Sequence, residues 1–177
     1  SLPADKPLYA YSDMELTDLY EDRIPLVEIC CAGPQVIPLL KDAIQRTDGE
    51  RKVLLAQALA LVGSDYGIPT LIEAVENHLQ GDRLPVRVAH IRYTQLPPDH
   101  GAMPDVVYLL YSLGTVPDER IVPVLQRVIA LMAFITEEDF YEQMQAACYY
   151  VDAVCFAAER LANANLIPKH GPKHQWV

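Results

Sequence analysis

The chain has 177 residues, of which 51% are hydrophobic, and a formal net charge of −10. That hydrophobic share is typical of a folded domain with a core and argues against disorder. The acidic balance argues against a nucleic-acid surface, because such surfaces neutralise phosphates with lysine and arginine. The sequence has no uninterrupted apolar stretch of about 18 residues, so we expect no membrane span and no membrane partner.

The first 22 residues form an acidic segment that also contains three tyrosines. Ser12 followed by Glu15 has the spacing of a capping box, in which each side chain bonds the other's backbone. This spacing predicts a short helix over about residues 13–22.

Three segments then repeat one pattern, at residues 23–47, 51–77 and 105–131. In each segment an apolar run closes on a glycine, a polar turn follows, and a proline opens a second apolar run. The glycines are Gly33, Gly63 and Gly114, and the prolines are Pro38, Pro69 and Pro123. Glycine is favoured just past the end of a helix and proline in the first turn of the next, so the pattern predicts helix–turn–helix units. In the second unit, Asp65 is the expected N-cap of the second helix.

A fourth unit is expected over residues 137–168. It opens with a long helix, and its last residues repeat the turn and the Ile-Pro pair of the second unit. The expected buried face of the long helix consists of apolar and small residues: Phe140, Met144, Ala147, Cys148, Val151, Val154, Cys155, Ala158 and Leu161. The tail at 169–177 is too rich in glycine, proline and charge to form another helix.

An insertion at 78–104 interrupts the repeat. Gly33 and Gly63 are 30 residues apart, whereas Gly63 and Gly114 are 51 apart. Prolines and β-branched residues in the added segment favour extended structure. The segment contains a basic and aromatic cluster, our candidate interaction patch: Arg83, Arg87, His90, Arg92 and Tyr93. Pairing of this cluster with the acidic N-terminal segment is an equally weighted alternative.

The chemistry-bearing residues favour a non-enzymatic chain, although they do not exclude an enzyme. All four cysteines lie in apolar runs, so we expect them to be buried and free, which favours a reducing compartment such as the cytoplasm. The sequence shows no phosphate loop, nucleophile elbow or zinc motif, so we predict no catalytic residue, cofactor or metal site.

The repeated pattern resembles HEAT repeats, in particular the short bacterial kind named after phycobilisome lyase subunits. The best match is Arg51–Val75, and the likeness covers about three quarters of the chain. It implies one all-α domain over residues 1–177, a right-handed α–α superhelix of about seven or eight helices. It also implies a non-catalytic protein–protein interaction scaffold. The expected concave surface, made by the second helix of each unit, contains Thr70, Glu73, Asn77, Gln126 and Arg127.

Two alternatives stay open. The chain begins with Ser1 rather than Met and its last unit lacks a second helix, which suggests an accessory domain of a larger enzyme, such as an oxidoreductase or lyase. Its partner would then be the catalytic domain of the same polypeptide. In a third and weaker interpretation, the chain is itself an enzyme with the insertion as a lid. The final repeat is poorly capped, so end-to-end self-association is also open.

Overall fold

The computed structural model describes residues 31–79, 84–85, 105–132 and 140–168. Within these residues it contains six α-helices and three short 3-10 helices and no β-strand, which confirms the prediction of an all-α protein. The predicted helix at 13–22 and nearly all of the insertion lie outside the described residues. The α-helices are α2 (Ile37–Gln45), α3 (Gly49–Leu61), α4 (Ile68–His78), α5 (Asp105–Thr115), α6 (Val122–Met132) and α7 (Phe140–Asn163), and the 3-10 helices are η2 (Pro34–Val36), η3 (Asp65–Gly67) and η4 (Glu119–Ile121).

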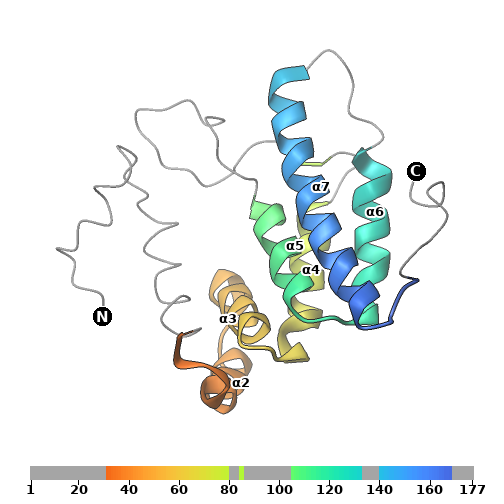
Figure 1. Ribbon diagram of the computed structural model, residues 1–177. Helices are drawn as coiled ribbons and strands as arrows, with labels where there is room; N and C mark the ends of the chain where they lie inside the picture. The colour runs from red at the N-terminus through yellow and green to blue at the C-terminus, as the bar shows by residue number, and fades with distance from the viewer. Residues whose placement is uncertain (1–30, 80–83, 86–104, 133–139, 169–177) are drawn as a thin grey trace.

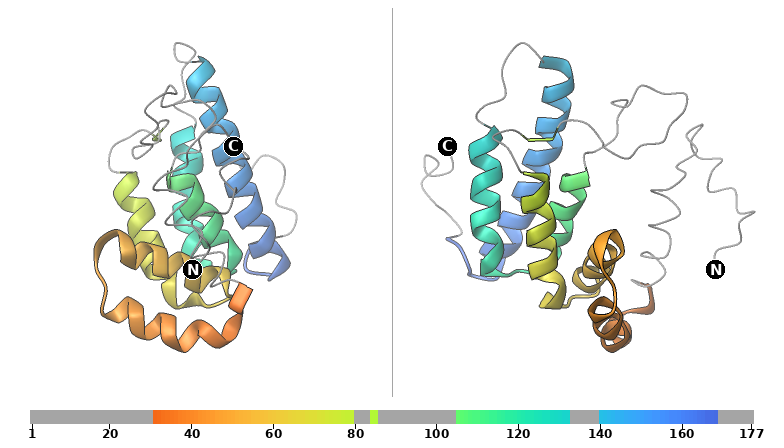
Figure 2. Two further views of the ribbon diagram at one scale, coloured as in Figure 1. Left: turned by 90° about the vertical axis from the view of Figure 1, so that its left-hand side faces the viewer. Right: turned by 180° about the vertical axis from the view of Figure 1, so that it is seen from behind.

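The helices contact one another in a regular order. The first helices of successive units lie next to each other, α3 against α5 and α5 against α7. The second helices follow alongside, since α4 contacts α3, α5 and α6, and α6 contacts α7. Helices α4–α7 run roughly side by side, while α2 and α3 lie across one end of this group (Figures 1 and 2).

Each second helix is entered in the same way. A three-residue 3-10 helix runs directly into the α-helix, and Pro38, Pro69 or Pro123 is the second residue of that helix. In the second unit the cap is Ser64, whose hydroxyl accepts a hydrogen bond from the Tyr66 N–H. The prediction that Asp65 caps this helix is therefore wrong: Asp65 lies one residue inside the turn, where its carboxylate is exposed. The side chain of Asp118 plays the capping role in the third unit.

Two first helices end in the same turn. At the end of α3, the Ser64 N–H bonds the Leu59 carbonyl at 2.8 Å and the Gly63 N–H bonds the Ala60 carbonyl at 2.9 Å. This is a Schellman motif with Gly63 at φ 86°, as the sequence predicts. The end of α7 repeats both bonds one for one, with Asn165 at φ 59° in the place of the glycine.

Gly114, by contrast, does not end its helix by turning the chain. It lies inside α5, and a Cβ there would come within 2.7 Å of the Phe156 ring and 3.0 Å of the Ala157 Cα. Its missing side chain lets α5 and α7 pack closely. Gly67 has a similar role beside α3, because its Cβ would lie 2.6 Å from the Ala56 carbonyl oxygen.

The core contains a few buried polar groups, all hydrogen-bonded. The Gln57 amide of α3 donates to the Ser112 hydroxyl of α5 at 3.2 Å, and that hydroxyl donates to the Tyr108 carbonyl. Tyr150 of α7 is fully buried and donates from its hydroxyl to the Pro85 carbonyl at 2.6 Å. Burial raises the pKa of Tyr150 well above its ordinary value. Leu84, beside Pro85, is also buried, so these two residues of the insertion are anchored on the helices.

The expected buried face of α7 is partly wrong. Val154 and Leu161 are buried, but Val151 is 45% exposed and Cys148 and Cys155 are exposed. The buried face consists mainly of Tyr150, Ala153, Val154, Ala157 and Leu161. Small and apolar residues occur all around this helix, so their spacing alone does not distinguish one face from the other. Cys31 is exposed as well, so burial is wrong for the three described cysteines, although all three are free as predicted.

Candidate functional site

The basic and aromatic patch predicted from the sequence lies outside the described residues. Arg83, Arg87, His90, Arg92 and Tyr93 are therefore not placed. The described residues next to the insertion form hydrogen bonds with other helices of the protein, and we do not propose that they bind a ligand. Leu79, just after α4, accepts a hydrogen bond on its carbonyl from Arg127 at 3.0 Å, and Pro85 accepts one from Tyr150.

The residues predicted for a concave surface lie on the exposed side of α4 and α6, except Thr70, which is half-buried. Glu73 and Gln126 are exposed, and the Glu73 carboxylate makes no ion pair with a described residue. Arg127 is already engaged, since it forms an ion pair with Glu76 and thereby joins α6 to α4. Its role is to hold two units together.

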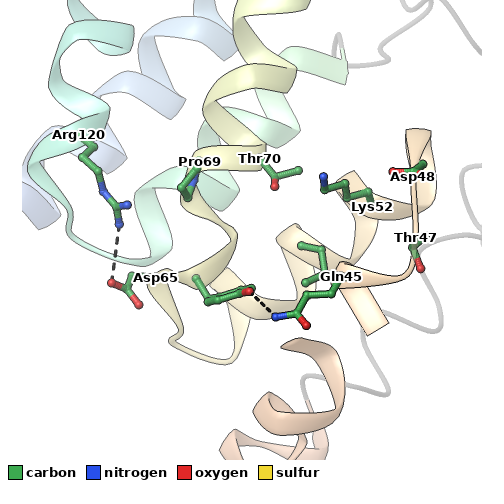
Figure 3. A pocket seen from close by; sticks show the side chains of 10 residues that line it. Gln45, Thr47, Asp48, Lys52, Asp65, Pro69, Thr70 and Arg120 are labelled. Atoms are coloured by element: carbon green, nitrogen blue, oxygen red, sulfur yellow. Dashed lines mark hydrogen bonds and ion pairs between the residues drawn. The ribbon is translucent and has the colours of Figure 1, made fainter. Parts of the chain in front are cut away.

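A hollow among the described residues lies where the turns of the second and third units meet the end of α2 and the loop that follows it (Figure 3). It has a volume of about 500 Å³, within the range of small-molecule sites. We refer to it as the turn hollow. Its lining comes from the end of α2 and the following loop, the start of α3, η3 with the start of α4, and η4: Ile44, Gln45, Thr47, Asp48, Lys52, Asp65, Tyr66, Pro69, Thr70 and Arg120.

One wall of the turn hollow is held by Tyr66. Its hydroxyl accepts a hydrogen bond from the Gln45 amide at 2.8 Å, which ties α2 to η3. The Lys41 ammonium lies 5.0 Å from the centre of the Tyr66 ring, within the range of a cation–π contact. The tyrosine is therefore positioned by groups on α2, although it is 40% exposed.

The opposite wall is held by Arg120. Its guanidinium donates to both carboxylate oxygens of Asp118, and it lies 3.7 Å from Asp65. The hydrogen bonds from Arg120 hold the pKa of Asp118 below its ordinary value, so this carboxylate stays charged. The pair thus links the turn of the second unit to the turn of the third.

Lys52 and Asp48 are the charged groups of the hollow that have no hydrogen bond or ion pair with a described residue. Lys52 is half-buried at the start of α3, and Figure 3 shows it directed toward Thr70 across the hollow. The hollow therefore offers an unpaired cation, an unpaired anion and a hydroxyl. These groups suit a polar ligand that carries both charges, as a peptide segment does.

Among the described residues, neither a cluster of metal ligands nor a membrane-spanning helix is found. No group of three or more metal-ligating side chains occurs there. In the same residues, no helix is both long and apolar enough to cross a membrane.

The sequence analysis did not identify the turn hollow. Most of the lining residues are ordinary polar surface residues, the exceptions being Ile44 and Pro69, and they come from three units. One signal in the sequence could have found them. Asp65 and Glu119 each directly follow the capping residue of their unit, Ser64 or Asp118, which places η3 and η4 at equivalent positions. Comparison of the chain with protein-family models, curated proteins and solved structures finds no match.

Proposed function

We propose that this chain is a HEAT-like repeat scaffold that binds a segment of another protein in the turn hollow. The observation that carries the proposal is that residues of three successive units line one hollow: the end of α2 with the loop after it, the second unit from α3 to the start of α4, and Arg120 of η4. Solenoid proteins build extended binding surfaces from neighbouring repeats.

The order of the helices supports a superhelical arrangement. First helices adjoin first helices, α4 adjoins α6, and the same 3-10 entry recurs in three units. In a HEAT-like array these are the contacts expected between layers, and a right-handed superhelix is the proposed continuation of that order.

The charges of the hollow suggest the chemistry of the bound segment. Lys52 is available to an acidic side chain or a chain terminus, and Asp48 to a lysine or arginine. Asp65 lies 3.7 Å from Arg120, which leaves room for a cationic group of the bound segment to compete for its carboxylate. The proposed partner is thus a polar protein segment with charges of both signs.

The test is affinity capture with the whole chain as bait, followed by quantitative mass spectrometry. Lys52→Glu reverses the unpaired charge in the hollow and should remove the specific partner. Arg51→Glu is the matched control, since Arg51 is the adjacent residue of α3, is exposed and lies outside the hollow. Both variants should have the circular dichroism spectrum of the wild type.

A partner retained equally by the three baits would contradict the proposal, as would the absence of any partner enriched over an unrelated acidic bait. Cross-links from the partner to the hollow would identify the bound segment. If that segment belonged to a catalytic domain of the same polypeptide, the scaffold would be an accessory domain.

A further inference from the structure

The ends of α3 and α7 are equivalent, which allows their surroundings to be compared position by position. Both helices end in a Schellman motif, at Gly63 and at Asn165. Aligning the two motifs places Ala56 of α3 opposite Ala158 of α7 and Leu59 opposite Leu161. At Ala56 and Ala158, the small side chain allows another element to approach the helix closely.

On α3 that position is covered by the next helix of the same unit. Ala56 is fully buried, and Gly67, the last residue of η3 directly before α4, packs on its backbone. Ile68 and Leu71 of α4 are fully buried in the same region. The apolar face of α3 is thus completed by a helix of 11 residues.

On α7 no described helix covers the equivalent position. Ala158 is half-buried and borders a shallow apolar groove between α6 and α7, which has about 10 Å³ of free space, enough for the tip of one side chain. The groove is apolar except for one glutamine, and its lining is Val122, Leu125, Gln126, Ile129, Val154, Ala158, Leu161 and Ile167. α6 and α7 lie at the opposite end of the described helices from α2 (Figure 1).

Next to this groove, α7 presents an exposed seam with the spacing of a helix–helix contact. Its residues alternate at intervals of three and four: Cys148, Val151, Cys155, Ala158 and Ala162. The first three are exposed and the two alanines are half-buried. A helix could therefore lie along the seam with its side chains inserted between these small residues.

Two acidic side chains border the seam on the side away from the groove. Asp152 and Glu159 are seven residues apart, so they lie on the same line of α7. Both are exposed, and neither forms an ion pair with a described residue. In a pair of packed helices, this flanking position selects the charge of the partner.

From these observations we infer that the groove between α6 and α7, with the α7 seam, is a docking site for a basic amphipathic helix of a partner protein. A helix is the expected occupant because α4 fills the equivalent position on α3. A basic flank is expected because Asp152 and Glu159 border the site. The inference rests on the scaffold function proposed above, but it concerns a different surface from the turn hollow.

The experiment uses the whole chain and two synthetic amphipathic helices of about 14 residues, the length of a few turns in groove-bound helices. Both peptides carry the same apolar stripe, and the flank is lysine in one and glutamate in the other. Fluorescence anisotropy measures their dissociation constants. The lysine peptide should bind about fivefold more tightly, since two exposed ion pairs each contribute a small factor, and added salt should reduce this preference.

Three variants make the result specific to this surface. Val151→Asp puts a charge in the middle of the seam and should weaken binding by about tenfold or more, since an unpaired charge would be buried. Leu61→Asp is the matched control, because Leu61 is equally exposed at 45% and lies on α3. The double variant Asp152→Lys/Glu159→Lys should reverse the preference toward the glutamate peptide.

Alkylation provides a second readout. The bound lysine peptide should slow iodoacetamide modification of Cys155 and leave that of Cys31, which precedes η2, unchanged. Weak and equal binding of both peptides, or a preference that the double variant does not reverse, would overturn the inference. Protection of Cys155 that rises with protein concentration, without peptide, would overturn it in favour of a second copy of the chain. If partner capture still depends on Lys52 in any of these cases, the proposed scaffold function survives while this docking site does not.

Discussion

The closest approach between two elements, at Gly67, gives a quantitative test of the packing. In Gly67→Ala the new Cβ would lie 2.6 Å from the Ala56 carbonyl oxygen, 0.8 Å inside the 3.4 Å at which ordinary contact begins. The neighbour is helix backbone and cannot rotate away, so α3 must move from the turn. Overpacking of this kind costs about 1 to 3 kcal/mol.

A compensating gain has to be subtracted. The backbone at Gly67 has φ −80° and ψ −12°, which alanine adopts freely. Replacing glycine there restricts the unfolded chain and stabilises the protein by about 0.4 to 1 kcal/mol. Subtracting the middle of the second range, about 0.7 kcal/mol, from the middle of the first, about 2 kcal/mol, gives an expected net loss in the free energy of unfolding of about 1.3 kcal/mol.

Urea denaturation followed by far-UV circular dichroism measures this loss, and Gly63 provides the control. A Cβ at Gly63 meets open space, but φ is +86°, so Gly63→Ala should lower the free energy of unfolding through backbone strain alone. Asparagine tolerates this conformation and stands at the equivalent turn as Asn165. We expect Gly63→Asn to cost less than Gly63→Ala, and Gly67→Asn to cost at least as much as Gly67→Ala. Equal costs of the asparagine substitution at the two sites, or a Gly67→Ala as stable as wild type, would refute the argument.

Two buried polar contacts lead to further predictions. Gln57→Leu and Ser112→Ala should each lower the free energy of unfolding by about 1 to 2 kcal/mol, because each leaves a buried partner without its hydrogen bond; the double variant should cost less than the sum. Tyr150→Phe should cost about 1 kcal/mol and increase proteolysis near Pro85, whose carbonyl loses its donor. Because burial raises the pKa of Tyr150, its stabilising contribution is complete below the ordinary tyrosine pKa of 10.0 and is lost progressively above it, as the unfolded chain ionises first.

Chemical denaturation at neutral pH checks the two stability predictions, with a thermodynamic cycle for Gln57 and Ser112. Strict additivity in that cycle would mean that the two side chains do not interact. Denaturation repeated at increasing pH checks the tyrosine. A Tyr150→Phe variant that loses stability above pH 10 as steeply as wild type would show that another group causes the loss.

The sequence predicted the helical elements because local signals define them. Gly63 marks the end of α3, and the three Ile-Pro or Val-Pro pairs mark the second helices, since proline and glycine act through their own backbone. The role of Gly114 was wrong because its partner, Ala157, is distant in the chain, and a glycine needed for close packing looks the same in sequence as one needed for a turn.

The candidate sites were less predictable than the helices. The face of α7 could not be read from spacing, because Cys148, Val151 and Cys155 on the exposed side are as apolar as the residues it buries. The turn hollow depends on Arg120 and Lys52 approaching one space from different units. Such convergence is a property of the packed array, and no local pattern encodes it.

The attachment of α2 has a consequence for hydrogen exchange. Among the described α-helices, α2 makes its extensive contact with α3 alone, whereas α5 lies between α3, α4 and α7. Leu40 and Ile44 are the two buried residues of α2, whereas Leu39 is 71% exposed, so this helix buries a smaller apolar face than the central helices. Local opening requires less free energy where fewer contacts are broken. Among the described helices, amide protons should therefore exchange fastest in α2, more slowly in α3 and slowest in α5.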